Sequence, residues 1–332
     1  MKSSSQVPET SRAKLTETSK NRKIGEYFMS DVLVLQITML LLIAIGAIIK
    51  KTGIISPIGQ QNINDLVIYL VLPCNIVKSF LIDWDHDTLR QFALVLVISI
   101  AIQIVSVILG KLLYGRKEIG HRMSLQYGVI CSNAGFLGNP VAEGVFGSIG
   151  LAMASIFLIP MRIMMWSSGI AIYTQSADWK GTLKKVATHP CIIACFAGLL
   201  LMLTQWQLPA VAEKTITTIG NCNTALSMMV IGMILADADI RALFDKEVLS
   251  YSLLRLILMP LVLYGICLFF HVPALVTGVC VILTGMPAGA TTSILASKYH
   301  AGELFATRLV VASTILSMAT IPVWSMMLTA GL

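Results

Sequence analysis

The chain has 332 residues, of which 56% are hydrophobic and only 12% are charged, and its mean hydropathy is +0.81. Ordinary soluble domains carry about 25% charged residues, so this composition excludes that class and indicates a polytopic membrane protein. The formal net charge is +7. The basic residues stand between the apolar runs, however, which is typical of membrane proteins, and we expect no nucleic-acid partner. All seven cysteines lie in apolar segments, where plain buried thiols are expected.

The N-terminal segment differs from the rest of the chain. Residues 1–30 are polar and contain no apolar run, so they do not form a secretory signal and we expect a disordered tail. Met29 stands directly before the first apolar run. This placement raises the hypothesis that Met29 is the natural start and that residues 1–28 do not belong to the native protein.

Apolar runs of about 20 residues, enough to cross the hydrocarbon of a bilayer, recur along the chain. They predict an all-α fold of ten membrane-spanning helices, at about 32–49, 58–81, 89–113, 123–147, 149–174, 190–205, 215–236, 248–270, 272–297 and 306–330. Five helices followed by five insert with opposite orientation. The expected domains are therefore two inverted repeats, 31–175 and 190–332, joined by a cytoplasmic linker over 176–189.

Loop charge predicts the orientation of these helices. The loops after odd-numbered spans and the ends of those spans carry thirteen Lys and Arg residues, whereas those after even-numbered spans carry only Lys78, Arg90 and Lys214. Because the basic side of a membrane protein faces the cytoplasm, both termini are expected outside a cytoplasmic membrane.

Two of the predicted spans contain residues that a continuous helix would not tolerate well. The fourth includes Ser132-Asn133-Ala134-Gly135-Phe136-Leu137-Gly138-Asn139-Pro140, and the ninth includes Gly285-Met286-Pro287-Ala288-Gly289-Ala290. Relative to Ala, Gly costs about 1 kcal/mol and Pro about 3 kcal/mol within a helix. Interrupted helices at corresponding positions of two halves are typical of a transporter binding site at mid-membrane. We therefore expect the two breaks to cross and to line a shared cavity.

The pattern resembles the auxin efflux carrier family, which includes the plant PIN-type carriers and bacterial permeases described for malate and malonate. The resemblance covers residues 31–330 and rests on the first break, followed by Phe146-Gly147, and on four shorter motifs. These are Leu70-Val71-Leu72-Pro73, Gly232-Met233-Ile234-Leu235, Arg255 to Pro260, and Met286-Pro287-Ala288-Gly289 with Ala296-Ser297-Lys298-Tyr299.

The resemblance implies ten helices in two inverted five-helix repeats, crossed fourth and ninth helices, and transport of a small organic anion. The plant carriers have a polar amide where this chain has Ala288, and many have a long cytosolic loop in place of its short linker. A dicarboxylate is therefore expected rather than auxin. Homodimerisation is an expectation from the resemblance alone.

The breaks supply the expected substrate-binding residues. Asn133 offers an amide to a carboxylate, with capping of its own broken helix as the structural alternative, and Asn139 is a second candidate. Gly135, Gly138, Pro140, Pro287 and Gly289 are expected to shape the backbone rather than to contact the ligand. All of these but Gly138 are placed in the expected substrate-binding site, together with Ala288. Thr291 could add a hydroxyl or could bond back to its own helix.

Charged residues inside the predicted spans are functional candidates by default. Arg162 suits bidentate capture of a carboxylate, with pairing to Glu143 or to another internal acid as the structural alternative. Asp65 and Glu143 are the candidates for coupling transport to protons, with a carboxylate paired to an arginine or to backbone N–H groups as the structural alternative for each. Arg255 and Lys298 are expected to be structural or anion-attracting residues.

The sequence thus predicts a secondary transporter, or permease, of a small carboxylate such as malate or malonate, driven by a proton or sodium gradient. It is not expected to be an enzyme, to hold a metal or to need a cofactor. A sodium-coupled bile-acid-type carrier and a membrane ligand sensor without net transport are the alternatives. The sequence names neither the substrate, the coupling ion nor the oligomeric state.

Overall fold

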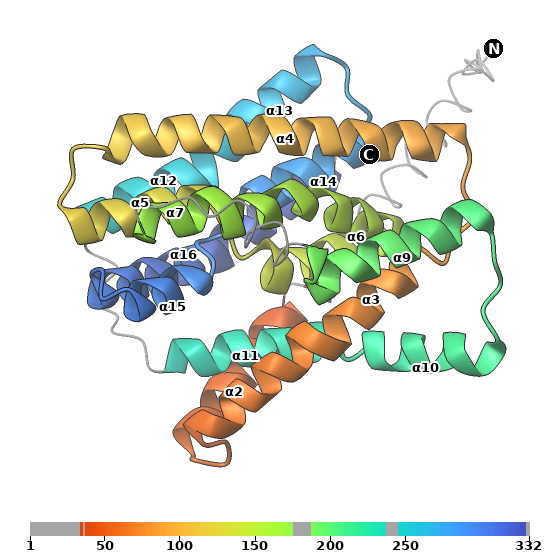
Figure 1. Ribbon diagram of the computed structural model, residues 1–332, viewed down its shortest axis with the longest axis horizontal. Helices are drawn as coiled ribbons and strands as arrows, with labels where there is room; N and C mark the ends of the chain where they lie inside the picture. The colour runs from red at the N-terminus through yellow and green to blue at the C-terminus, as the bar shows by residue number, and fades with distance from the viewer. Residues whose placement is uncertain (1–33, 36, 175–186, 237–244, 330–332) are drawn as a thin grey trace, which may run out of the picture.

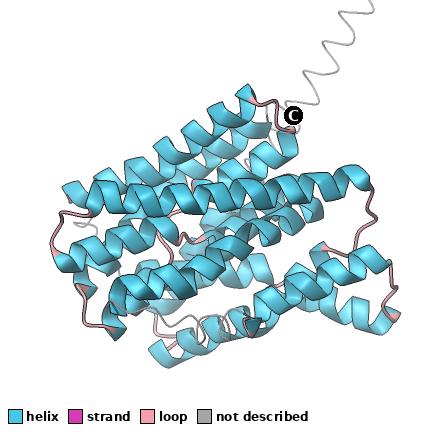
Figure 2. Cartoon of the chain, turned by 45° about the horizontal axis from the view of Figure 1, so that its top comes forward, coloured by secondary structure: helices cyan, strands magenta, loops and turns pink. Residues whose placement is uncertain are grey.

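The computed structural model describes residues 34, 35, 37–174, 187–236 and 245–329, and all regular structure in them is helical (Figures 1 and 2). The predicted tail 1–30 with Met29, most of the linker 176–189 and Asp237 to Asp239 lie outside these residues. A helix over 37–51 comes first. The helices that follow, with η marking wide π-helical turns, are α2 (Pro57–Leu66), η1 (Val67–Val71), α3 (Leu72–Ser79), α4 (His86–Tyr114), α5 (Ile119–Ile130), η2 (Ala134–Gly138), α6 (Asn139–Met164), η3 (Met165–Gly169), α7 (Ile170–Thr174), α9 (Pro190–Thr204), α10 (Ala210–Gly220), α11 (Asn223–Ala236), α12 (Lys246–Leu253), η5 (Leu254–Leu258), α13 (Met259–Phe269), α14 (Ala274–Thr284), α15 (Thr291–Lys298) and α16 (Glu303–Thr329).

Five helical runs among the described residues are, by length and composition, long and apolar enough to cross a membrane. They are His86–Tyr114, Ala134–Met164, Ala210–Ala236, Lys246–Phe269 and Glu303–Thr329. The first begins at Asp85, whose carboxylate accepts the Thr88 backbone N–H at 2.7 Å, and its 29 residues extend about 43 Å. These runs identify a multi-pass membrane protein. The arrangement in ten spans remains a prediction.

A sharp kink divides the run from Ala134 to Met164. Gly147 has φ 69° and ψ −162°, a conformation that is strained for residues with a Cβ atom. This residue lies where the sequence predicts the fourth span to end and the fifth to begin. The kink turns the apolar run into two helical pieces.

Proline explains three of the wide helical turns. The segments η1, η2 and η5 end at Val71, Gly138 and Leu258, in each case two residues before a proline, namely Pro73, Pro140 or Pro260. A proline cannot donate the helical hydrogen bond, and its ring clashes with the carbonyl four residues earlier. The preceding turn widens in response, which keeps the helices continuous at η1 and η5.

The helices pack in two groups, each of which takes elements from both predicted halves. One group contains α2, α3, α9, α10 and α11, and the other contains α4, α5, α6 and α12 to α16. Figure 1 shows α2, α10 and α11 at the bottom and α4 and α13 at the top. Contacts of α6 with α3 and α9, and of α11 with η2, join the groups. The first break therefore lies at the boundary between them.

The predicted helix over 215–236 contains an interruption that the sequence reading did not anticipate. Helix α10 ends at Gly220, and α11 begins at Asn223 after a turn at Asn221 and Cys222. A Cβ on Gly220 would lie 3.0 Å from the Cα of Asn75, so glycine permits a close approach to α3 here. The turn places Asn221 beside the charged residues described below.

Candidate functional site: the crossover of two broken helices

The two predicted breaks meet in the interior. The backbone N–H of Asn133 donates to the carbonyl of Pro287 at 2.8 Å, and the N–H of Gly289 donates to the carbonyl of Cys131 at 3.1 Å. Ser132 and Ala288 thereby form one antiparallel pair, and all of these contacts are buried. This pairing satisfies backbone groups that a helix would otherwise satisfy, as a break within hydrocarbon requires.

Residues of α12 and η5 bind carbonyl oxygens at the same place. Tyr251 donates its hydroxyl to the carbonyl of Gly128 at 2.9 Å, and Arg255 donates from Nη1 to the carbonyl of Val129 at 3.2 Å. Arg255 Nε donates to the carbonyl of Met286 at 3.3 Å. Gly128 and Val129 lie in the last turn of α5, where carbonyls have no helical partner and the helix dipole favours a positive charge. Arg255 therefore ties one break to the other.

Arg162 lies near the first break in a different setting. Its side chain is only 4% exposed, and its Nη1 makes no hydrogen bond within the described part of the chain. A Cβ on Gly135 would lie 4.0 Å from Arg162 Nη2, so the guanidinium faces the first turn after the break. Glu143, the expected alternative partner, instead forms its ion pair with Lys78.

The positive charge of Arg162 also reaches the start of α9. His189 is the N-cap residue of that helix and accepts the Cys191 N–H at 3.3 Å through Nδ1. Burial, followed by the charge of Arg162, lowers the pKa of His189 from 6.5 to about 4. The imidazole is therefore neutral at pH 7 and adds no second positive charge.

Two asparagines flank the short π-helical turn η2. Asn133 precedes it with φ −80° and ψ 32° and is 9% exposed, and its side chain makes no capping hydrogen bond. Asn139 follows it and is fully buried, and neither side-chain polar atom has a partner among the described residues. Pro140 stands in the first turn of α6, where its missing N–H is tolerated. The break therefore carries buried amides with unused hydrogen-bonding capacity.

The second break presents mainly backbone and small side chains. Pro287, Ala288 and Gly289 form its extended segment, and the Ala288 N–H donates to Ser313 Oγ at 3.2 Å. Thr291 begins α15, and its buried hydroxyl lies close to the hydroxyl of Tyr127. Lys298 lies in the last turn of α15, with its ammonium 5.8 Å from the ring centre of Tyr299.

The two candidate coupling acids lie in contrasting environments. Glu143 is partly buried and bonds to Lys78 Nζ at 2.8 Å and to Asn75 Nδ2 at 3.0 Å. Asp65 is exposed on α2. Lys78 also donates to Asn221 Oδ1 at 2.9 Å. The sequence analysis counted Lys78 only as a basic residue near the end of the second predicted span, and it did not single out Asn75 or Asn221. The Gly220-Asn221-Cys222-Asn223 run nevertheless contains the same residue types, Gly and Asn, as the first break.

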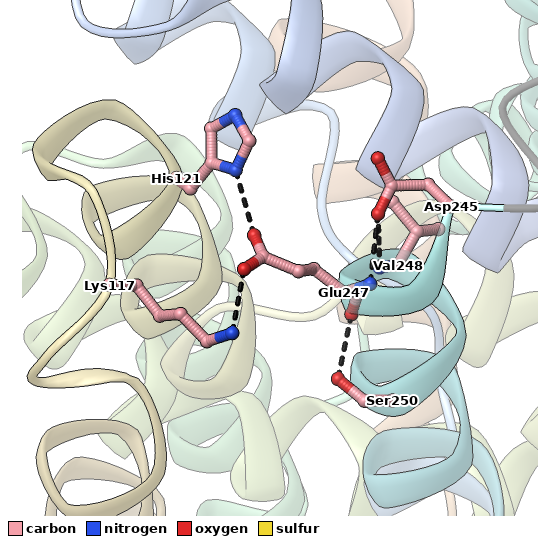
Figure 3. Close-up of polar contacts among 6 residues, drawn as sticks. All are labelled: Lys117, His121, Asp245, Glu247, Val248 and Ser250. Carbon is pink, nitrogen blue, oxygen red and sulfur yellow. Dashed lines mark hydrogen bonds and ion pairs between the residues drawn. The ribbon is translucent and has the colours of Figure 1, made fainter.

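A separate polar cluster, centred on Glu247, connects α12 to the segment around the start of α5 (Figure 3). Glu247 accepts from Lys117 and pairs with His121, both at 2.7 Å, and the His121 ring stacks on Phe305 at 3.7 Å between centroids. Asp245 accepts the N–H groups of Glu247 and Val248 and so begins α12. These contacts hold the start of α12 against α5. Tyr251 lies in α12, and Arg255 lies in η5, which follows it directly. No group of three or more His, Cys, Asp or Glu that could hold a metal occurs within the described ranges.

Comparison with known proteins identifies related chains. The family model described as "Membrane transport protein" matches residues 31–180 and 179–325. An uncharacterized transporter of Methanothermobacter thermautotrophicus is 26% identical over 297 residues, covering 88% of this chain and 97% of that protein. The uncharacterized transporter MJ1031 of Methanocaldococcus jannaschii is 22% identical over 301 residues, covering 87% of this chain and 96% of that protein. The uncharacterized transporter YfdV of Escherichia coli K12 is 26% identical over 202 residues, covering 57% of this chain and 63% of that protein.

Proposed function

Since the chain belongs to the membrane transport protein family, that of the auxin efflux carriers, we propose that it is a secondary transporter of a small organic anion, with a carboxylate such as malate or malonate as substrate. The substrate would bind beside the crossover. The observation that carries this proposal is Arg162, a buried guanidinium beside the first break with a nitrogen that has no partner in the described chain.

The chemistry of the first break supports an anion in particular. A charge buried without a partner is unfavourable, and a bound carboxylate would supply the missing interaction. The planar guanidinium can bind both oxygens of a carboxylate at once. The N–H groups at the start of η2 and the amides of Asn133 and Asn139 offer further donors. Asn133, Gly135, Asn139, Pro140 and Arg162 form the substrate-facing side of this proposed site.

The second break would close the proposed site with its backbone. Pro287, Ala288 and Gly289 pair with the first break, and Thr291 adds a buried hydroxyl. Alternating access would come from movement of one helix group against the other, because the first break lies at their boundary. Glu143 is the preferred coupling residue, since a proton taken up there would weaken its ion pair with Lys78, which belongs to the opposite group. Asp65 is the second candidate.

The proposed setting is the cytoplasmic membrane, with both termini outside. The loop charges support this orientation. Extracytoplasmic termini would place the Lys78 end of α3 towards the outside and the cluster around Glu247 towards the cytoplasm.

Uptake into proteoliposomes tests the proposal. Labelled malate, malonate and monocarboxylates would be offered under an imposed proton gradient, a sodium gradient or neither. We expect saturable uptake of one acid, reduced by a factor of about ten to one hundred in Arg162→Ala, which corresponds to the loss of one hydrogen bond to a charged group. Asn133→Ala should reduce uptake in the same direction.

Arg116→Ala is the matched control, because Arg116 is an exposed arginine in the loop between α4 and α5. It should transport like the unmodified protein. Absence of uptake for every acid, or normal uptake by both Arg162→Ala and Asn133→Ala, would contradict the proposed site. If uptake requires a sodium gradient, the coupling ion is sodium, and protonation of Glu143 is not the coupling step.

A further inference from the structure

A large apolar groove runs between α4 and the helix formed by η5 and α13, apart from the crossover site. Its volume is about 1160 Å³, and one wall comes from α4 and the other from η5 and α13. Figure 1 shows these helices together at the top of the molecule. Aliphatic side chains dominate both walls, among them Leu94, Ile98, Ile102, Leu258, Val262 and Ile266. Pockets for small ligands are typically about 300–1,000 Å³, so this groove has room for a larger apolar molecule.

The length of the groove matches the bilayer rather than a soluble ligand. On α4 the lining extends from Asp87 to Leu109, which is about 33 Å of helix. The hydrocarbon core of a bilayer is about 30 Å thick. Both flanking helices belong to runs apolar enough to cross a membrane. An alkyl chain can therefore contact the aliphatic walls along the whole length of this groove.

Only one end of the groove is polar. There it is lined by Asp87, Arg90, Gln91 and His271. Asp87 and Arg90 are exposed, and neither makes an ion pair within the residues that the structure describes. Their opposite charges stand three residues apart on α4, that is, on one face of the helix. A phosphate suits Arg90 and Gln91, and an ammonium group suits Asp87.

The floor of the groove carries one further polar atom. Thr284 ends α14 and is only 1% exposed, and its hydroxyl has no partner in the described part of the chain. It lines the groove together with the apolar side chains of α4 and α13. The groove therefore reaches the residue before Gly285, where the second break begins, while remaining separate from Arg162 and Asn133.

We propose that this groove is a binding site for one phospholipid with an amine-bearing, zwitterionic headgroup. The phosphate binds Arg90 and Gln91, the amine binds Asp87, and an acyl chain lies between α4 and α13. The charge pattern favours this occupant over an anionic lipid, because a purely anionic headgroup would face the Asp87 carboxylate without a compensating cation. Loop charges assign this end of the groove to the outer leaflet.

Native mass spectrometry of the full-length protein in mild detergent tests the site. Phosphatidylethanolamine and phosphatidylglycerol would be added separately, and the number of lipids bound per chain counted. We expect one retained phosphatidylethanolamine, with retention reduced about tenfold in Arg90→Gln, as loss of a charge-assisted hydrogen bond predicts. Ala101→Trp, which places a bulky ring in the groove, should abolish retention.

Ile100→Trp is the matched control, since Ile100 is exposed on α4 but does not line the groove. It should retain the lipid, and size-exclusion profiles and melting temperatures identify any variant that fails to fold. Equal retention by the unmodified protein, Arg90→Gln and Ala101→Trp would overturn the proposal. Preferential retention of phosphatidylglycerol would overturn the headgroup assignment. If the unmodified protein is a dimer and Ala101→Trp is a monomer, the occupant of the groove is a second copy of the chain and not a lipid.

Discussion

The two buried arginines near the crossover, Arg255 and Arg162, have the same side chain in opposite circumstances. Arg255 is 1% exposed and donates to the carbonyls of Val129 and Met286. Arg162 is 4% exposed, and its Nη1 has no partner among the described residues. One guanidinium completes the hydrogen bonding of the fold, and the other retains capacity for a further partner.

This difference separates stability from recognition at the crossover. Removing a group that satisfies buried carbonyls leaves those carbonyls without partners, whereas removing an unpaired buried charge relieves an unfavourable burial. Substitution of Arg255 should therefore destabilise the folded protein. Substitution of Arg162 should weaken substrate binding while the protein stays folded.

The largest effect is expected at Arg255. Arg255→Met should destabilise the protein by about 2–5 kcal/mol, because two buried carbonyl oxygens lose their donor. Denaturant unfolding in detergent, monitored by tryptophan fluorescence, measures this change. Arg162→Met is the matched control and should keep or raise the stability, and equal destabilisation of both variants would remove the distinction between the two residues.

A carboxylate introduced beside Arg162 should act as a permanent substitute for the substrate. A Cβ at position 135 meets only Arg162 Nη2 within 4.0 Å, so Gly135→Asp fits and places its carboxylate near the guanidinium. We expect uptake to fall about one hundredfold, as competition by a tethered ligand at high effective concentration predicts. Thermal stability should not fall.

Gly135→Asn has nearly the same shape without the charge and should retain more transport than Gly135→Asp. If both variants lose uptake equally, the effect is steric and the charge of Arg162 has no part in it.

A smaller effect is expected at Tyr251, which donates one hydrogen bond to the Gly128 carbonyl. Tyr251→Phe should lower the free energy of unfolding by about 1 kcal/mol, the usual contribution of a single hydrogen bond. Substrate affinity should stay the same, because the hydroxyl contacts the fold and not the proposed site. A large loss of substrate affinity with an unchanged free energy of unfolding would instead show that Tyr251 takes part in substrate recognition.

The smallest effect concerns pH. The pKa of His189 is lowered to about 4 in the folded protein, so the unfolded chain binds this proton more readily. The contribution of His189 to stability is therefore complete above about pH 6.5 and falls as the pH decreases towards 4. His189→Gln should make stability less dependent on pH between 7.5 and 5.

The same comparison in an Arg162→Gln background tests the charge of Arg162. The pH dependence due to His189 should become weaker there, because one cause of the lowered pKa is removed. An unchanged dependence would show that burial alone lowers the pKa.

The sequence predicted the features that depend on local backbone chemistry. Gly and Pro identified both breaks, with Asn as a further indication at the first, and the kink at Gly147 lies at the predicted boundary between the fourth and fifth spans. The interruption at Asn221 carried a similar Gly and Asn composition but was missed, because it lies inside a segment of the length expected for a single membrane span. The corresponding positions of the two breaks in the predicted halves led to the expectation that they cross, and the family resemblance implied the same.

Contacts between residues that are far apart in the chain could not be predicted from the sequence. Arg255 and Val129 are 126 positions apart, and Lys78 and Glu143 are 65 apart. Nothing in the local pattern distinguishes an arginine that bonds to helix-end carbonyls from one that remains unpaired, since both stand in apolar helices. Only the packing of α12 and η5 on the end of α5 assigns the two roles.

Equilibrium binding of labelled malate, malonate and monocarboxylates to the purified protein tests the central claim most directly. The account predicts saturable binding of one acid that Arg162→Gln weakens by a factor of about ten or more, while Arg116→Gln binds normally. Binding by Arg162→Gln with unchanged affinity, or no binding of any acid to the unmodified protein, would contradict it.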